Sequence, residues 1–176
     1  MNADSTASQG NPVAQLEAAP VAAAQSGAAA APLAEMAQRL PLRILVAEDN
    51  PTNVKLIKIV LGGLGYHPDV AGNGLEVLTA LRRQPYDVVL MDVHMPELDG
   101  IETTRRIRDQ WRQGQRPRIV ALTAGVMPEE RKACQDAGVD EFLVKPAVRA
   151  QLIEVLERCR PLGVGAEPAV AAQAGS

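Results

Sequence analysis

Aromatic side chains are nearly absent from this 176-residue chain, which has one Trp, two Tyr and one Phe. Because 47% of the residues are apolar, the core must be built from Val, Leu, Ile and Ala. An aliphatic core is typical of a parallel sheet buried between helices and unlike an aromatic-rich sandwich. The length suits one ordinary domain with flanking segments.

Cysteine is rarer still, with two residues. Cys134 and Cys159 lie far apart, in no spacing typical of metal or redox sites, which fits the reduced thiols of a cytosolic protein. The first residues lack the basic start and apolar run of a secretion signal. No apolar stretch is long enough to span a membrane. We therefore expect a cytoplasmic location and no membrane contact by this segment.

A surplus of positive charge is missing too. Acidic and basic residues balance between 41 and 160. The net charge of −3 therefore arises in the flanks, which hold Asp4, Glu17, Glu35 and Glu167 but only Arg39 as a basic residue. Nothing in this distribution resembles the basic face of a nucleic-acid-binding domain, so we expect no direct contact with nucleic acid.

Composition divides the chain into three segments. Residues 1–40 are rich in Ala, Gln, Ser, Gly and Pro and are expected to be a disordered leader or linker. Its end, Ala31 to Leu40, could form a short helix; we favour transient helicity over a connector to an upstream module. Residues 41–160 carry the features of a folded domain, and residues 161–176 return to Ala, Gly and Pro as a disordered tail.

Within the folded segment, short apolar runs alternate with helical patterns. The runs read LRILVA, YHPDVA, YDVVLMDV, PRIVALTA and DEFLV. This alternation predicts five strand–helix pairs, in which crossover connections form a parallel sheet. Pro68 lies in the second run and cannot donate a backbone hydrogen bond, which favours an edge position for that strand.

Polar side chains follow four of the five predicted strands. The first strand ends in Glu48 and Asp49, the third in Asp92, the fourth in Thr123 and the fifth in Lys145. Ligands bind at the carboxyl ends of such strands. Three clustered carboxylates repel one another, and Mg²⁺ is the hard, oxygen-seeking cation that relieves this. A carboxylate oxygen could then attack a phosphoryl group in line, while Lys145 and Thr123 hold its other oxygens.

The segments ILVAEDNPTN, VVLMDVHMPELDG, IVALTA and FLVKP, in this order and spacing, resemble the receiver domain of bacterial response regulators. The resemblance covers about residues 42–160. It implies a flavodoxin-like (βα)5 fold, a doubly wound parallel sheet with strand order 2-1-3-4-5. It also implies that Asp92 is the phosphoacceptor, that Glu48 and Asp49 organise Mg²⁺, and that Lys145 contacts the phosphoryl group.

Four further expectations come from the same resemblance. His94 would supply its backbone carbonyl to the metal, and its imidazole is expected to be a surface side chain. Thr123 and Phe142 would form a switch pair that alters the face of the fourth helix, fifth strand and fifth helix. His94 and Gly125 depart from the commonest pattern at positions flanking the phosphoryl group, so they would set its lifetime. The bond before Pro146 would be cis.

The resulting functional prediction is a phosphoacceptor in a two-component phosphorelay. Its partner would be a sensor histidine kinase or a histidine phosphotransfer protein, and the domain would be a monomer or weak dimer. The sequence of the first motif, ILVAEDNPTN, favours the receiver of a hybrid sensor kinase, with a stand-alone regulator as the alternative.

Two other classes stay open. A haloacid-dehalogenase-like phosphatase also uses an Asp at a strand end, but it needs a second Asp where His94 stands. A non-phosphorylated pseudo-receiver would act only as a binding module, which the intact acidic pair, acceptor, Thr and Lys disfavour. A flavin-binding flavodoxin is disfavoured because no Ser/Thr-rich phosphate loop follows the first strand.

Overall fold

A computed structural model describes residues 36–125 and 127–163 and contains one parallel sheet with strand order β2-β1-β3-β4-β5. The strands are β1 (Ile44–Ala47), β2 (Asp69–Ala71), β3 (Val88–Asp92), β4 (Arg118–Thr123) and β5 (Glu141–Val144). The predicted doubly wound α/β fold and its strand order are therefore confirmed. Pro68 lies immediately before β2, and β2 is an edge strand, as the missing N–H requires.

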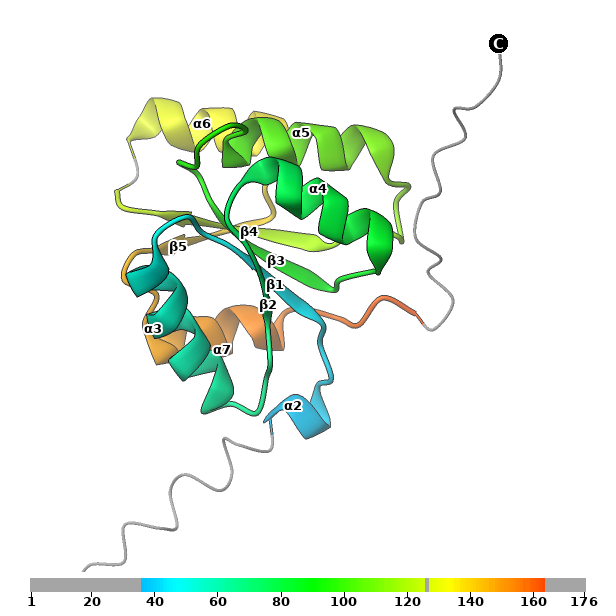
Figure 1. Cartoon of the computed structure of the whole chain (residues 1–176), viewed down its shortest axis with the longest axis vertical. Helices are drawn as coiled ribbons and strands as arrows, with labels where there is room; N and C mark the ends of the chain where they lie inside the picture. The colour runs from blue at the N-terminus through cyan, green and yellow to red at the C-terminus, as the bar shows by residue number, and fades with distance from the viewer. Residues whose placement is uncertain (1–35, 126, 164–176) are drawn as a thin grey trace, which may run out of the picture.

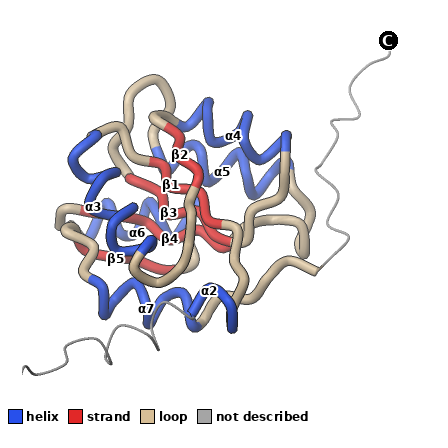
Figure 2. Tube along the Cα trace, turned by 60° about the horizontal axis from the view of Figure 1, so that its bottom comes forward, coloured by secondary structure: helices blue, strands red, loops and turns tan. Residues whose placement is uncertain are grey.

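Helices cover both faces of this sheet (Figure 1). They are α2 (Met36–Arg39), α3 (Pro51–Gly62), α4 (Gly74–Arg83), α5 (Gly100–Gln110), α6 (Pro128–Ala137) and α7 (Arg149–Glu157). One core cluster joins α2, α3 and α7 to one face, and two others join α4, α5 and α6 to the opposite face. In Figure 2 the strands, in red, lie between these helices. The core is mainly aliphatic, as the scarcity of aromatics predicted, and it also contains Tyr66, Tyr86 and Trp111.

Both flanks of the folded segment differ slightly from the predicted boundaries. Met36 is buried in the core and Ala37 N donates to Leu64 O, so the packed structure begins before residue 41. At the other end, Leu162 N donates to Asp87 Oδ1 at 2.6 Å. These residues pack because an apolar side chain and a backbone donor find partners on the domain. Most of the predicted leader and tail lies outside the described residues.

Local sequence signals fix how α3 follows β1. Asn50 caps the helix by accepting from Thr52 N, and Pro51 occupies its first turn. Gly100 begins α5 for a steric reason, because a Cβ there would lie 2.1 Å from Asp92 O. The loop from β1 to α3 and the loop from β3 to α5 both leave the carboxyl end of the sheet. Their turns position the side chains that follow β1 and end β3.

Candidate functional site

Three carboxylates meet at the carboxyl end of the sheet. Glu48, Asp49 and Asp92 each offer an oxygen, and these oxygens lie within 4.8 Å of one another. Their proximity follows from register, since Ala47 of β1 pairs with Met91 of β3, so the next residues of both strands emerge side by side. Glu48 and Asp92 are buried, whereas Asp49 is exposed. The predicted acidic cluster is thus present.

Lys145 supplies the positive charge of this cluster. Its Nζ lies 2.7 Å from Glu48 Oε2 and 2.7 Å from Asp92 Oδ2. Lys145 N donates to Thr123 O at 2.7 Å, which holds the chain after β5 against the end of β4. The Lys145–Pro146 bond is cis, as expected. One ammonium group therefore faces two buried carboxylates.

Glu48 is held firmly within the site. Its side chain is only 1% exposed, so it is not a solvated partner of Lys145. Asn53 Nδ2 donates to Glu48 Oε1 at 2.9 Å, and Asn50 N donates to the same oxygen at 3.3 Å. Glu48 Oε2 contacts Lys145 as an ion pair but has no directed hydrogen bond within the described structure. Asn53 was missed by sequence reasoning, although its place in the EDNPTN motif could have indicated it.

Burial shifts the ionisation of the central pair. Desolvation raises the pKa of Asp92, and the repulsion from Glu48 adds to it, against the lowering effect of Lys145. Burial alone would lower the pKa of Lys145, but its contacts with Asp92 and Glu48 outweigh this and raise it. Lys145 is therefore held in its charged form, whereas burial and repulsion from Glu48 disfavour the charged form of Asp92. An added cation would stabilise the charged form of Asp92.

Comparison with known proteins matches this geometry to one family. The family model described as response regulator receiver domain matches residues 44–157. The chain belongs to the response regulator receiver domain family. It is a two-component phosphorelay signalling domain, as the motifs predicted.

Similar proteins support this assignment. Sensor histidine kinase GacS of Pseudomonas protegens is 40% identical over 124 residues, a match that covers 69% of this chain and 13% of that protein. Sensor histidine kinase RcsC of Salmonella typhi is 37% identical over 68% of the chain and 13% of its own length. The chain thus spans a small part of the curated relatives that it matches.

Solved structures agree. The receiver domain of sensor histidine kinase PA1611 from Pseudomonas aeruginosa, with a magnesium ion coordinated in the active site cleft, is 41% identical. It covers 66% of this chain and 95% of its own, with a TM-score of 0.61. The Saccharomyces cerevisiae structure of phosphotransfer protein Ypd1 with the receiver domain of Ssk1 is 25% identical and has a TM-score of 0.60, covering 65% and 86% of the two chains.

The residues after Asp92 shape one side of the receiver site. His94 N lies 3.3 Å from Asp92 Oδ1 and donates to it. The His94 imidazole is 77% exposed, and its Nε2 lies 3.3 Å from Glu130 Oε1 on α6. The ring is therefore a surface side chain, as expected, and it is turned toward α6. Gly125 has open space around its would-be Cβ, so this receiver has no side chain there.

The expected switch residues lie next to this site but in a specific arrangement. Thr123 Oγ1 donates to Gly125 O at 2.8 Å, so the hydroxyl is engaged by its own loop. Phe142 is partly buried, and the Arg131 guanidinium lies 4.7 Å from its ring centroid. Arg131 was missed by sequence reasoning because no local motif reports a contact between α6 and β5.

The acidic cluster has the donor set that a hard divalent cation needs. Carboxylate oxygens from Glu48, Asp49 and Asp92 lie within 4.8 Å of one another, so three carboxylates face the ammonium group of Lys145. Mg²⁺ prefers this set of oxygen ligands.

The described helices include none long and apolar enough to cross a membrane.

Proposed function

We propose that Asp92 accepts a phosphoryl group from the phosphohistidine of a sensor histidine kinase or a histidine phosphotransfer protein. The observation that carries the proposal is the Lys145 ammonium, 2.7 Å from Asp92 Oδ2, beside two further carboxylates. An Asp92 oxygen attacks phosphorus, the bond to the histidine nitrogen breaks, and Lys145 stabilises the negative charge of the transferred group.

The metal part of the proposal concerns four residues. Glu48, Asp49, Asp92 and the His94 carbonyl would hold Mg²⁺, which supplies charge neutralisation for the phosphoryl oxygens. Asn53 fixes the orientation of Glu48 through its 2.9 Å hydrogen bond. Hydrogen bonds that orient a metal-ligating side chain in this way influence the affinity of the metal site.

The donor would approach over α3. A groove of about 620 Å³ is lined by Glu48 and Asp49 together with Lys55, Ile59 and Val70, among others. The Ile59 side chain is 62% exposed and Val70 is 43% exposed. Exposed apolar residues in the same groove as Glu48 and Asp49 suit a helical partner that presents a histidine to Asp92.

Phosphorylation would be read out on the other side of the site. We infer that Thr123 Oγ1 leaves Gly125 O to bind the phosphoryl group, and that Phe142 moves with it, which alters the α6, β5 and α7 face. Gly125 and His94 would set the phosphoryl lifetime because they flank its oxygens. In the cell, we propose a cytoplasmic domain that acts as a monomer or weak dimer, as part of a hybrid sensor kinase.

The test is labelling of the purified chain with acetyl phosphate and Mg²⁺. Wild type and the control Asp136→Asn, whose exposed carboxylate pairs with Lys132, are expected to become labelled. Asp92→Asn is expected to remain unlabelled. Labelling that persists in Asp92→Asn, or its absence in wild type, would contradict the proposal; the second result would point to a pseudo-receiver.

A further inference from the structure

Arg131 on α6 lies over the ring of Phe142, the aromatic member of the expected switch pair. Its Cζ atom is 4.7 Å from the ring centroid, within the range of a cation–π contact. The ring packs against the core cluster of Val93, Ala121 and Cys134 but stays only partly buried. Arg131 therefore adds a contact from another element to a ring that the core covers only in part.

This contact is what orients the exposed Arg131 side chain. Its neighbours on α6 have polar partners, since Glu130 lies 3.3 Å from the His94 imidazole and Lys132 pairs with Asp136. Within residues 36–125 and 127–163, Arg131 has no ion pair of this kind. The helix that carries it is fixed, because Cys134 on its inner face is buried in the core. The guanidinium group is thus held over the ring by a helix that is itself anchored.

The contact occurs together with one particular state of the Thr123 hydroxyl. One small cavity is lined by Thr123, Gly125, Arg131 and Phe142, among others. Thr123 Oγ1 donates to Gly125 O at 2.8 Å and accepts from Gly125 N at 3.2 Å. The hydroxyl is therefore engaged by its own loop, while Arg131 contacts Phe142 on the neighbouring strand.

The direction of the effect follows from linkage. A contact made in one of two conformations stabilises that conformation, so a ligand that needs the other one binds less tightly. Under the proposed function, Phe142 moves when Thr123 turns to the phosphoryl group, and this movement breaks the contact with Arg131.

We propose that Arg131 is a positioning residue that holds Phe142 in its unphosphorylated arrangement and thereby opposes phosphorylation of Asp92. The proposal rests on the proposed function and adds a residue of α6 to the regulation of that site. Charge alone would act in the opposite direction, because a cation near the site attracts an anionic group. Removal of Arg131 should therefore strengthen phosphoryl binding if Arg131 acts through Phe142, and weaken it if Arg131 acts through its charge.

The experiment is a titration of the full chain with beryllofluoride at saturating Mg²⁺, followed by amide NMR spectra. Beryllofluoride binds a carboxylate reversibly in place of a phosphoryl group, so its dissociation constant reports the equilibrium between the two arrangements. Arg131→Ala should bind it about threefold more tightly, the size expected for an exposed cation–π contact. Arg131→Lys keeps a cation and should lie between wild type and Arg131→Ala.

Two controls separate this role from general effects of charge or stability. Lys132→Ala removes the next cation along α6, which pairs with Asp136, and it should not tighten binding. In a Phe142→Leu background the ring is absent, so Arg131→Ala should no longer alter the affinity. The amide spectrum shows whether each variant is folded, and the order of wild type, Arg131→Lys and Arg131→Ala decides the matter if Phe142→Leu is not.

Three results would overturn the proposal. They are an Arg131→Ala affinity equal to or weaker than that of wild type, an equal tightening in Lys132→Ala, and an effect of Arg131→Ala that persists without the Phe142 ring. Wild type that does not bind beryllofluoride would contradict the phosphoacceptor function and this proposal with it. Normal binding by wild type and an unaltered affinity in Arg131→Ala would contradict the role of Arg131 alone.

Discussion

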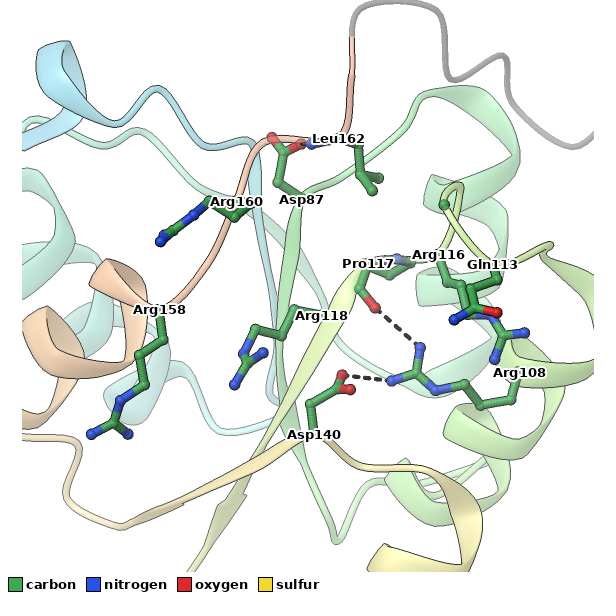
Figure 3. A pocket seen from close by; sticks show the side chains of 11 residues that line it. Asp87, Arg108, Gln113, Arg116, Pro117, Arg118, Asp140, Arg158, Arg160 and Leu162 are labelled. Carbon is green, nitrogen blue, oxygen red and sulfur yellow. Dashed lines mark hydrogen bonds and ion pairs between the residues drawn. The ribbon is translucent and has the colours of Figure 1, made fainter.

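The two ends of the sheet carry opposite charge excesses and form them in different ways. At the carboxyl end, Glu48, Asp49 and Asp92 outnumber Lys145, and each follows directly from a strand. At the amino end, arginines from α5, β4 and the chain after α7 outnumber the carboxylates that remain free. Short side chains fixed by strand register make a compact site for a small cation. Long side chains from separate elements make a wider pocket lined by several arginines (Figure 3).

Removal of Lys145 should affect the acidic end most. Lys145→Ala leaves Glu48 and Asp92 buried without their cation, so phosphorylation should fall below detection. Without Mg²⁺ the free energy of unfolding should fall by about 2 kcal/mol, less than for a fully buried pair because Lys145 is partly exposed. Added Mg²⁺ should restore part of this loss. Urea titration of each form measures the effect.

The matched control is Lys132→Ala, whose exposed pair with Asp136 should contribute less than about 0.5 kcal/mol. Equal destabilisation by the two variants would show that the acidic end does not depend on its lysine.

Loss of the Asn53 amide should weaken metal binding without removing a ligand. Asn53→Ala frees Glu48 Oε1 from its 2.9 Å hydrogen bond, and Mg²⁺ affinity should fall about tenfold. Isothermal titration with Mg²⁺ measures the change. Thr52→Ala, at the exposed neighbouring position, should bind Mg²⁺ as wild type does; an unaltered affinity in Asn53→Ala would remove Asn53 from the site.

Neutralising the acceptor should stabilise the metal-free protein. The pKa of Asp92 is raised in the folded state, so the folded protein binds this proton more tightly than the unfolded chain does. The contribution of Asp92 to stability therefore increases as pH falls toward its folded pKa, and Asp92→Asn mimics the protonated form. We expect a rise in Tm of about 2–4 °C at neutral pH without Mg²⁺. A fall in Tm would show that the Lys145 ion pair outweighs burial.

A side chain at position 125 should have the smallest effect of these substitutions, a change in the decay rate of the phosphoryl group. Gly125→Asn adds an amide where space is open, and the decay rate of the phosphoryl group should change by about threefold, or about 0.6 kcal/mol in the barrier. Mg²⁺ affinity should stay as in wild type. The decay of labelled protein measures the rate, and an unchanged rate would remove Gly125 from the residues that set the lifetime.

The sequence predicted the fold and the acidic end because both depend on local patterns. Apolar runs report strands, and parallel strands bring their carboxyl ends together, so Asp92 and Lys145 could be placed in one site from spacing alone. Pro68 placed β2 at an edge for a similarly local reason.

The sequence did not predict contacts between distant elements. Arg108 reaches Gly138 O, Pro117 O and Asp140, and its side chain is only 15% exposed. The arginine pocket and the Arg131–Phe142 contact depend on how long side chains turn between elements, which no local motif specifies.

The position of the phosphoryl group tests the central claim most directly. Borohydride reduction of the chain after treatment with acetyl phosphate and Mg²⁺ converts a phosphorylated aspartate to homoserine, which tandem mass spectrometry locates. The account predicts homoserine at position 92 alone. Homoserine at position 49 or elsewhere, or no conversion in a sample that carries the label, would contradict it.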